Sequence, residues 1–510
     1  MNRYCVWSRL AIFFAACACF FVLRPLLLDP DYYWHLETGR LIFEQWALPS
    51  SDVFAYTNPE RPWVLHEWLF QLLLFAIYDR FGDLGIRMLC TAVATATLGV
   101  VYSTALKLSG RHSAAAVITS LTLILLTPFI LPRPQIFSFL FFAVFLRVVL
   151  AAKYFDDRRS FYWLPVLMAA WVNLHGGYGI GLVLLFMFAA LEWFRAWEKR
   201  QIAGKWRYLR QISLLALLSL LASFINPDGP AHLLYPLDIV SMAATAVIFE
   251  WQPPTPHAYV GKPYFMIVGM FILLLVYRRA KPGVTEMGLS AAMIAAGMLS
   301  IRHVPFAALT MAAMTSRAVL TDINADGRIG AFAQRMLSRL TSAQRGAREL
   351  GRAEVFLNVG ICAAILAGTA IYSPTAKARE ADALARWLPV NAVEFIRENE
   401  IKGRMFNSLH FGGYLIHRLY PQMRVFIDGR TDYYGDRFFT EYLNLNFGSD
   451  GWEDILQKYK IEMVISEPQA PLRNMLLLRG DFALVYQDES SSVLLKREEK
   501  YQDVIRRNGH

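Results

Sequence analysis

The sequence predicts a polytopic α-helical membrane protein that carries a small α/β domain at its C-terminal end. Apolar residues make up 55% of the 510-residue chain and charged residues only 18%. Soluble domains are about 45–50% apolar and about 25% charged. The apolar residues gather in runs that are long enough to cross a bilayer as helices. The last part of the chain has instead the alternating pattern of a soluble domain.

The hydrophobic runs predict about eleven membrane-spanning helices. The first run follows Arg3 and Arg9 and has the composition of a signal peptide. Because many hydrophobic segments come after it, we expect this run to remain as the first span. In chain order, the predicted spans are 10–28, 84–106, 113–132, 135–152, 161–174, 177–195, 209–225, 263–277, 284–301, 303–319 and 353–373.

Lys and Arg residues concentrate in every second loop, which sets the predicted orientation. The loop from Arg317 to Arg352, for example, carries seven arginines. The positive-inside rule places the N-terminus inside, and an odd number of spans then places the C-terminal segment outside. We therefore expect a transmembrane domain at 1–373, with a large first outer loop at 29–83, and an outward-facing (periplasmic) α/β domain at 374–510.

The C-terminal segment alternates helical and strand patterns. "NAVEFIRENEI" has helical spacing, and "RVFIDGR" is typical of a short strand. "GWEDILQKYKIEMVISE" predicts a helix followed by a strand, and "FALVYQDESSSVLLKRE" predicts a hairpin. Alternation of this kind favours a compact α/β domain.

Charge and cysteine content argue against a nucleic-acid-binding protein and against a disulfide-stabilised protein. The net charge of +10 agrees with basic inner loops, and the sequence has neither zinc-ligand spacing nor an RNA-binding signature. We therefore expect no nucleic-acid partner. The five cysteines lie in or near apolar runs, which indicates buried thiols and no disulfide framework: Cys5, Cys17, Cys19, Cys90 and Cys362.

The stretch "LLLDPDYYWHLETGR" places two carboxylates, Asp29 and Asp31, where the first hydrophobic run ends. Aromatic residues follow them directly, as is typical of the headgroup region of a bilayer. A carboxylate at the membrane surface can serve as a general base or as a ligand of a hard cation. The alternative is that the two carboxylates have no chemical role and simply begin a solvated loop, with the aromatic residues forming an interfacial belt.

Further polar groups fall in the predicted outer turns. Arg133 stands between two prolines in "LPRPQIF", and Arg302 stands in the tight turn "SIRHVP". Both lie on the side that the positive-inside bias avoids, which favours phosphate binding; the alternative is snorkelling to the interface. The remaining candidates for substrate binding in these outer segments are His35, Asp52, His66, Glu67, His175 and His303.

Two later segments add candidates. Glu250 in "IFEWQPP" is a second candidate acid, or a plain loop residue. "VFIDGRTDYYGDRF" groups Asp428, Arg430 and Asp432 after a predicted strand. Loops at strand ends commonly carry binding groups, but an internally salt-bridged turn would have the same sequence.

This arrangement resembles the GT-C class of membrane glycosyltransferases. "DYYWH" looks like the Asp-x-Tyr opening of the first outer loop in oligosaccharyltransferase catalytic subunits, and "NAVEFIRENEIKGRMFNSLHFGGYLIHRL" is similar to the start of their soluble tail. Their Trp-Trp-Asp-Tyr-Gly motif is replaced here by Ser408-Leu409-His410-Phe411-Gly412, which argues against glycosylation of Asn-x-Ser/Thr. The outer turn "PFILPRPQIF" also lacks their acidic pair, so the simpler GT-C enzymes that move a single sugar look closer.

The resemblance implies transfer of a sugar, with inversion, from a polyprenyl-phosphate-linked donor on the outer face of a bacterial cytoplasmic membrane. The acceptor would be a lipid, a glycan or a protein. Asp31 would be the base, or the ligand of a divalent cation (Mg²⁺ or Mn²⁺), with Asp29 beside it and Glu250 as a second acid. His35, His66 and Glu67 would shape the acceptor side, and Arg133 and Arg302 would bind the donor phosphate. Asp428, Arg430 and Asp432 would contact a sugar. The alternative is a non-catalytic glycolipid-binding protein, or a transporter of polysaccharide or lipid-linked sugar.

Overall fold

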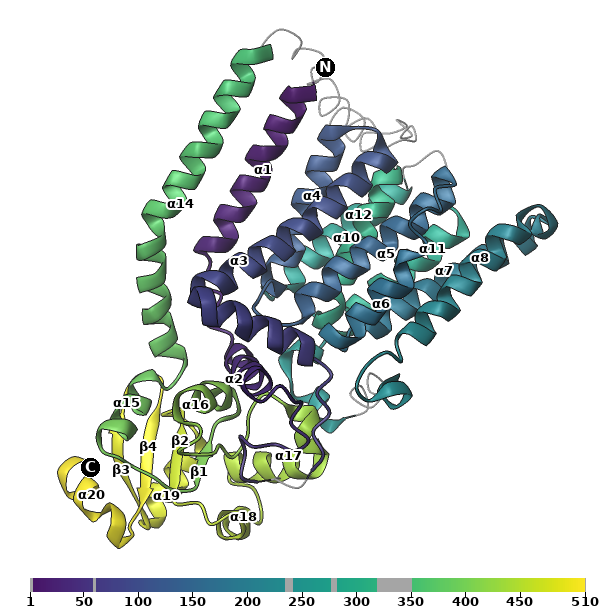
Figure 1. Cartoon of the computed structure of the whole chain (residues 1–510). Coiled ribbons are helices and arrows are strands. Elements are labelled where there is room, and N and C mark those ends of the chain that lie inside the picture. Colours follow the sequence, from purple (N-terminus) through teal and green to yellow (C-terminus); the bar gives the residue numbers. More distant parts are fainter. Residues whose placement is uncertain (1–2, 58–60, 234–241, 277–281, 319–350, 510) are drawn as a thin grey trace. The chain divides into compact units, whose positions relative to one another are not determined.

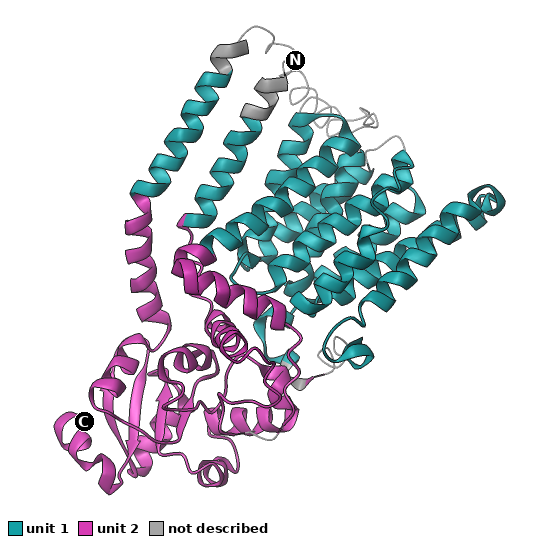
Figure 2. Cartoon of the chain, in the orientation of Figure 1, with its two compact units in different colours: residues 1–22, 87–238, 245–371 teal, residues 23–86, 239–244, 372–510 magenta. Residues whose placement is uncertain are grey.

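The computed structural model describes residues 3–57, 61–233, 242–276, 282–318 and 351–509 (Figure 1). These residues form two compact units (Figure 2). Unit 1 comprises Met1–Val22, Arg87–Asp238 and Thr245–Ile371, and unit 2 comprises Leu23–Ile86, Ile239–Ala244 and Tyr372–His510. The first outer loop, which we grouped with the transmembrane domain on sequence grounds, is thus part of the same unit as the C-terminal segment.

The described residues of unit 1 form helices joined by turns and irregular segments, without a β-strand. Each of the predicted spans overlaps a helix. These helices are α1 (Arg3–Leu23), the second part of α3 (Trp68–Ser109), α4 (His112–Leu126), α5 (Gln135–Phe155), α6 (Trp163–Leu174), α7 (Tyr178–Glu198), α8 (Ile202–Ala222), α10 (Gly261–Val276), α11 (Val284–Leu299), α12 (Val304–Ala318) and most of α14 (Gly351–Trp387). Short 3₁₀ helices connect several of them: η1 (Thr127–Phe129), η2 (Gly229–Leu233), η4 (Phe249–Trp251) and η5 (Ile301–His303). A further one, η3, spans Ala243–Ala246.

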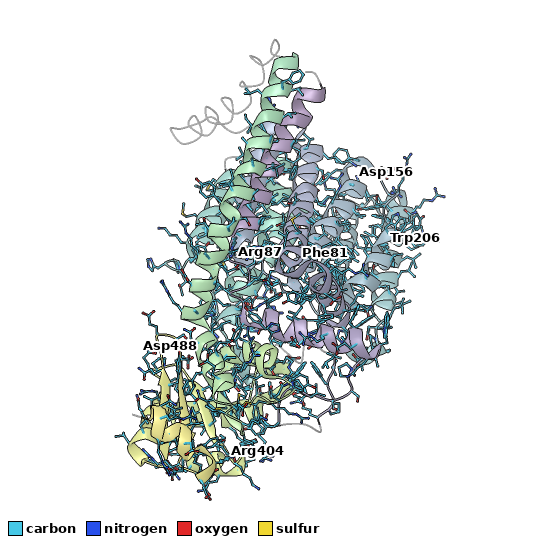
Figure 3. All side chains as sticks on the ribbon, turned by 60° about the vertical axis from the view of Figure 1, so that its left-hand side comes forward. Phe81, Arg87, Asp156, Trp206, Arg404 and Asp488 are labelled. Carbon is cyan, nitrogen blue, oxygen red and sulfur yellow. The ribbon has the colours of Figure 1, made fainter. Side chains whose placement is uncertain are left out.

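Within the described ranges, five helices are long and apolar enough to cross a membrane by length and composition: Trp68–Ser109, His112–Phe129, Gln135–Phe155, Tyr178–Glu198 and Val355–Trp387. Four shorter helices are also apolar: Arg9–Leu23, Trp163–Leu174, Gly261–Val276 and Val284–Leu299. Large apolar side chains are exposed on the helices, including Phe81 and Trp206 (Figure 3). Such surfaces suit a lipid environment, so the chain is a multi-pass membrane protein; the number of spans stays a prediction.

Helix α3 contains a break at Gly82. Its backbone angles there are φ 58° and ψ −153°, a conformation that glycine adopts without steric cost. The break separates residues Trp68–Phe81 from the remainder of the helix. The sequence-predicted span at 84–106 begins just after this break.

Unit 2 contains a four-stranded sheet with helices around it. The strands are β1 (Met405–Asn407), β2 (Met463–Ser466), β3 (Phe482–Gln487) and β4 (Ser492–Lys496), in the order β1-β2-β4-β3. Strand β1 is parallel to β2, and the other pairs are antiparallel. The helices are α2 (Pro30–Gln45), the first part of α3, the end of α14, α15 (Val390–Glu398), α16 (Gly412–Leu419), α17 (Thr431–Phe447), α18 (Trp452–Lys458), α19 (Pro471–Arg479) and α20 (Gln502–Asn508), with the 3₁₀ turns η6 (Leu409–Phe411) and η7 (Glu499–Tyr501). The predicted helix–strand segment and hairpin are present.

The strand that we predicted at "RVFIDGR" is wrong. This segment makes one isolated bridge, between Val425 and Ala55, and is otherwise irregular. The side chain of Asn407 takes the place of a neighbouring strand. Its amide donates to the Ile427 carbonyl at 2.8 Å, and its oxygen accepts from the Phe426 N–H at 2.9 Å. A side chain therefore satisfies backbone groups that a ladder would otherwise pair.

Two consecutive glycines allow α16 to pack closely against its neighbours in unit 2. A Cβ atom at Gly413 would overlap the carbonyl oxygen of Pro30, at the start of α2. A Cβ atom at Gly412 would overlap the Ile427 carbonyl oxygen. The pair "GG" thus permits a backbone approach that no larger residue allows.

We predict that Gly413→Ala lowers the thermal stability of the protein, because the backbone of α2 has to move away. Overpacking of this kind costs about 1–3 kcal/mol. Thermal unfolding in detergent, followed by the loss of tertiary signal, measures the effect. The control is Gly204→Ala on α8, where nothing lies within 4 Å of the added Cβ. Equal unfolding temperatures for the two variants would contradict the packing argument.

Candidate active site

The two carboxylates of "DPDYYWH" have different places at the start of α2. Asp29 is the N-cap residue, and its buried side chain accepts a hydrogen bond from the Asp31 N–H at 3.1 Å. Pro30 occupies the first turn, where its missing N–H costs nothing. Asp31 follows in that turn and is only half-buried. Asp29 therefore caps the helix, whereas Asp31 is a partly exposed residue of its first turn.

The Asp31 carboxylate is held on both sides. Its Oδ1 accepts a hydrogen bond from Trp34 Nε1 at 3.2 Å. The same oxygen lies against Gly429, where an added Cβ would overlap it. The N-terminus of α2 also favours negative charge at this position. Gly429 comes from the C-terminal segment, so the tail of the chain supplies the space that Asp31 occupies.

Arg430, next to Gly429, is buried between two carboxylates. Its Nη1 lies 2.8 Å from Asp52 Oδ1, and its Nη2 lies 2.6 Å from Asp428 Oδ2. The Tyr434 hydroxyl donates to the same Asp428 oxygen at 2.7 Å. The guanidinium also lies 4.5 Å from the centre of the Trp63 ring. Burial alone would lower the pKa of Arg430, but Asp428 and Asp52 outweigh it and hold the pKa well above its ordinary value.

This buried cluster gives Asp52, Asp428 and Arg430 internal partners. Asp52 additionally accepts hydrogen bonds from the backbone N–H groups of Phe54 and Ala55. The contacts match the internally salt-bridged turn that the sequence left open. Their predicted contact with a substrate sugar stays a prediction.

A second group of polar residues surrounds Glu67. His66 Nε2 lies 3.4 Å from Glu67 Oε1, and His35 Nδ1 lies 3.8 Å from Glu67 Oε2. The Gln71 side chain lies 3.3 Å from His35 Nδ1. Burial by itself would lower the pKa of His66, but Glu67, Asp432 and a backbone hydrogen bond together raise it above its ordinary value. The predicted residues His35, His66, Glu67 and Asp432 therefore do form an interacting group.

In unit 1, two separately predicted site residues, Arg133 and Glu250, form an ion pair. Arg133 Nη1 lies 2.9 Å from Glu250 Oε1. Arg302 stacks on Trp251, with 4.9 Å between its guanidinium carbon and the ring centre. The charge of Arg133 and that of Arg302 lower the pKa of Glu250, against the opposite effect of burial. Two guanidinium groups thus act on one carboxylate.

The two histidines predicted in unit 1 differ in their environment. His175 is buried, and its Nδ1 accepts from the Ser138 hydroxyl at 2.6 Å and from the Gly177 N–H at 3.1 Å. Trp171 Nε1 in turn donates to Ser138 at 2.7 Å. His303 lies beside Arg302, with its ring centre 6.4 Å from that of Trp251. His303 therefore belongs with the arginine group, and His175 with the helix packing.

The described residues contain no group of three or more His, Cys, Asp or Glu side chains that could hold a metal ion. The divalent cation that the resemblance allows at Asp31 stays a prediction. No step below is assigned to a metal.

Sequence reasoning missed Trp34 and Gly429 as neighbours of Asp31. Trp34 had been assigned to the aromatic belt, although its spacing of three residues from Asp31 on one helix was a usable signal. For Gly429, the sequence offers only a glycine between two charged residues. Its contact with Asp31 depends on tertiary packing.

No family model and no curated protein sequence matches this chain. Solved structures do. The apo oligosaccharyltransferase of Archaeoglobus fulgidus matches over 91% of this chain and 70% of its own length, with 14% identity and a TM-score of 0.57. ArnT from Cupriavidus metallidurans in the apo state matches over 95% of this chain and 97% of its own length, with 15% identity and a TM-score of 0.50. Both are glycosyltransferases of the GT-C class. The chain has the GT-C fold.

The A. fulgidus enzyme has also been solved tethered to an acceptor peptide that contains the NVT sequon. The match to that structure covers 98% of this chain and 75% of the A. fulgidus chain. Its identity to this chain is 14% and its TM-score is 0.55. At these identities the comparison establishes the GT-C fold. The resemblance drawn from "DYYWH" and from the start of the tail is confirmed at this level.

Within this GT-C fold, we predict that Arg430→Gln strongly destabilises unit 2. The substitution leaves Asp52 and Asp428 buried without their counter-charge, which costs about 3–5 kcal/mol. Limited proteolysis and thermal unfolding measure the loss. The control is Arg437→Gln, whose side chain is 93% exposed. If the two variants unfold alike, the buried cluster does not hold this unit together.

We predict that the stabilisation by His66 depends on pH. A histidine whose pKa is raised by folding stabilises the folded state below its unfolded pKa of about 6.5, and this contribution is lost as pH rises through the folded pKa. The difference in unfolding temperature between wild type and His66→Gln should therefore be larger at acidic pH and smaller at alkaline pH. The exposed His257 provides the matched variant, His257→Gln. A difference that grows with pH would show that the sign is reversed.

Proposed function

We propose that this protein is a membrane glycosyltransferase that moves a sugar from a polyprenyl-phosphate-linked donor to an acceptor hydroxyl on the outer face of a bacterial cytoplasmic membrane. The observation that carries the proposal is the half-buried Asp31 carboxylate at the start of α2, directly after the first hydrophobic helix. The GT-C fold, shared with two glycosyltransferases, supports it. The acceptor class remains a lipid, a glycan or a protein.

Asp31 has the properties that a general base requires. The residue is partly exposed, and Trp34 and Gly429 contact one of its carboxylate oxygens. It takes the proton of the acceptor hydroxyl while that oxygen attacks the anomeric carbon from the side opposite the phosphate. The bond from the anomeric carbon to the phosphate oxygen breaks, and the configuration at the anomeric carbon inverts. A fixed carboxylate lowers the entropic cost of this step.

Arg133 and Arg302 are assigned to the phosphate of the donor. Guanidinium groups stabilise the negative charge that builds on a leaving phosphate. Glu250 holds Arg133 by an ion pair of 2.9 Å. Arg133 and Arg302 lower the pKa of Glu250, which favours the ionised form that pairs with Arg133, so we assign Glu250 to orienting Arg133. Its predicted role as a second catalytic acid stays a prediction.

The group of His35, His66, Glu67 and Asp432 is assigned to the acceptor. Its carboxylates and imidazoles offer hydrogen-bond acceptors and donors for sugar or alcohol hydroxyl groups. Charge on His66, favoured by Glu67 and Asp432, adds a cation to the group. In the predicted orientation, the N-terminus lies inside and unit 2 faces outward.

The first test is transfer of label from a radiolabelled polyprenyl-phosphate-sugar pool in membranes. We expect Asp31→Asn, at matched expression, to lower transfer by about 10²–10⁴-fold, the usual contribution of a general base. Gly429→Ala should also lower it, because its Cβ displaces the carboxylate. Glu44→Gln, an exposed change of the same charge on α2, is the control and should keep wild-type transfer.

The outcomes separate the alternatives. Equal transfer by wild type and Asp31→Asn would remove Asp31 from the mechanism. Loss of donor affinity in Arg133→Gln, with Asp31→Asn still binding donor, would separate binding from chemistry. If wild type transfers no sugar from any of several donors but binds them, the glycolipid-binding or transport interpretation replaces the enzyme.

A further inference from the structure

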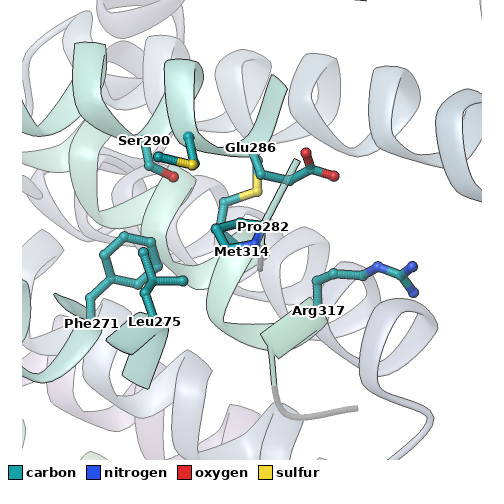
Figure 4. A pocket seen from close by; sticks show the side chains of 8 residues that line it. Phe271, Leu275, Pro282, Glu286, Ser290, Met314 and Arg317 are labelled. Carbon is teal, nitrogen blue, oxygen red and sulfur yellow. The ribbon is translucent and has the colours of Figure 1, made fainter. Parts of the chain in front are cut away.

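Helices α10, α11 and α12 enclose a pocket in unit 1 (Figure 4). Phe271 and Leu275 from α10 and Met314 from α12 form an apolar wall. The empty space, mouth included, is about 250 Å³. Its deep part has room for one small group, about the size of a water molecule. The pocket is lined neither by Asp31 nor by the Arg133 group, so it is separate from the proposed sugar-transfer residues.

Two polar atoms at this pocket are buried without a partner. Among the residues that the structure describes, neither Ser290 Oγ nor Glu286 Oε2 makes a hydrogen bond. Ser290 is only 5% exposed, and both residues line the pocket (Figure 4). A buried polar atom left unpaired costs free energy, and a hydrogen-bond donor in the pocket would satisfy such an oxygen.

The other oxygen of Glu286 is already engaged. Its Oε1 lies 3.3 Å from Lys153 Nζ and accepts a hydrogen bond from the Tyr154 hydroxyl. Lys153 is buried and is shared with Glu192, at 2.7 Å. The Lys153 ammonium thus forms ion pairs with two carboxylates, those of Glu192 and Glu286. The cluster fixes Glu286 and leaves Oε2 to accept from a positively charged donor.

Arg317 adds a fixed cation to the pocket lining. Its guanidinium carbon lies over the Tyr154 ring, 4.4 Å from the ring centre. Arginine can contact an aromatic face and bind phosphate through its N–H groups. The lining therefore combines an acceptor pair for a cation, an arginine for an anion, and an apolar wall.

We propose that this pocket binds the headgroup of an aminophospholipid with a primary amine. The protonated amine enters the pocket that Glu286 and Ser290 line, the phosphate lies at Arg317, and the acyl chains lie along Phe271 and Leu275. Because the deep part admits only a small group, an ammonium fits and a trimethylammonium does not. The predicted orientation places this end of the helices in the inner leaflet, since Arg278, Arg279 and Lys281 follow α10 in the sequence.

The test measures lipid binding to the full-length protein in detergent, by native mass spectrometry with added phosphatidylethanolamine, phosphatidylcholine or phosphatidylglycerol. We expect phosphatidylethanolamine to bind roughly tenfold more tightly than the other two, as for a charge-assisted hydrogen bond. Ser290→Ala and Arg317→Gln should each weaken this binding about tenfold. Their controls are Ser120→Ala on α4 and Arg210→Gln on α8, both exposed.

Each other outcome overturns the proposal in a defined way. Equal binding of phosphatidylcholine would exclude recognition of the primary amine. Equal binding of phosphatidylglycerol would show that the pocket recognises only the lipid phosphate, at Arg317. Full competition by inorganic phosphate would indicate a free-phosphate site. If no lipid binds specifically, the pocket holds a water molecule instead. Ser290→Ala keeps the Lys153 cluster intact, so a folding defect does not confuse the result, and sugar transfer is not the readout.

Discussion

The buried Arg430 is the centre on which the architecture of unit 2 depends. It joins Asp52, from the first outer loop, to Asp428, from the C-terminal segment. Charges buried at 2% exposure or less are tolerated only when they are paired and hydrogen-bonded, and here each partner is. Because the pairing joins segments that are 378 residues apart in the sequence, the loop and the tail form one unit. A domain boundary at residue 373 would separate the first outer loop from the C-terminal segment, which this cluster connects.

That cluster also determines the surroundings of Asp31. Gly429 stands between Asp428 and Arg430, so the ion pairs that hold its neighbours also fix Gly429. Gly429 in turn lies against Asp31, and Gly413 lies against Pro30 one residue earlier. Asp29 directs the start of the helix by capping it. The position of the Asp31 carboxylate therefore depends on the residues packed around it, a common relation between a reactive group and its supporting residues.

Unit 1 contains two groups of charges with different chemistry. At one group, Arg133 and Arg302 act on a single carboxylate, Glu250, so positive charge is in excess. At the other, Lys153 lies between two carboxylates, and a nearby pocket holds unpaired acceptor oxygens. Ionisable groups within a membrane domain are costly and are retained where they serve binding or structure. The first group suits a phosphate, and the second suits an amine beside a phosphate.

The sequence alone determined the membrane class, the helical segments and the candidate carboxylate. Apolar length and the position of Asp31 after the first hydrophobic run are local properties, and local pattern predicts them. Tertiary structure decided which partners each charge has. The sequence "FIDGR" is equally compatible with a binding loop and a salt-bridged turn, and Asp52, far away in the sequence, supplies the partner that bridges Arg430. Likewise "RVFIDGR" had strand composition, but Asn407 satisfies its backbone and no neighbouring strand pairs along it beyond one bridge. Partners brought together by folding are invisible to a local pattern, because the free energy of a buried charge depends on what surrounds it.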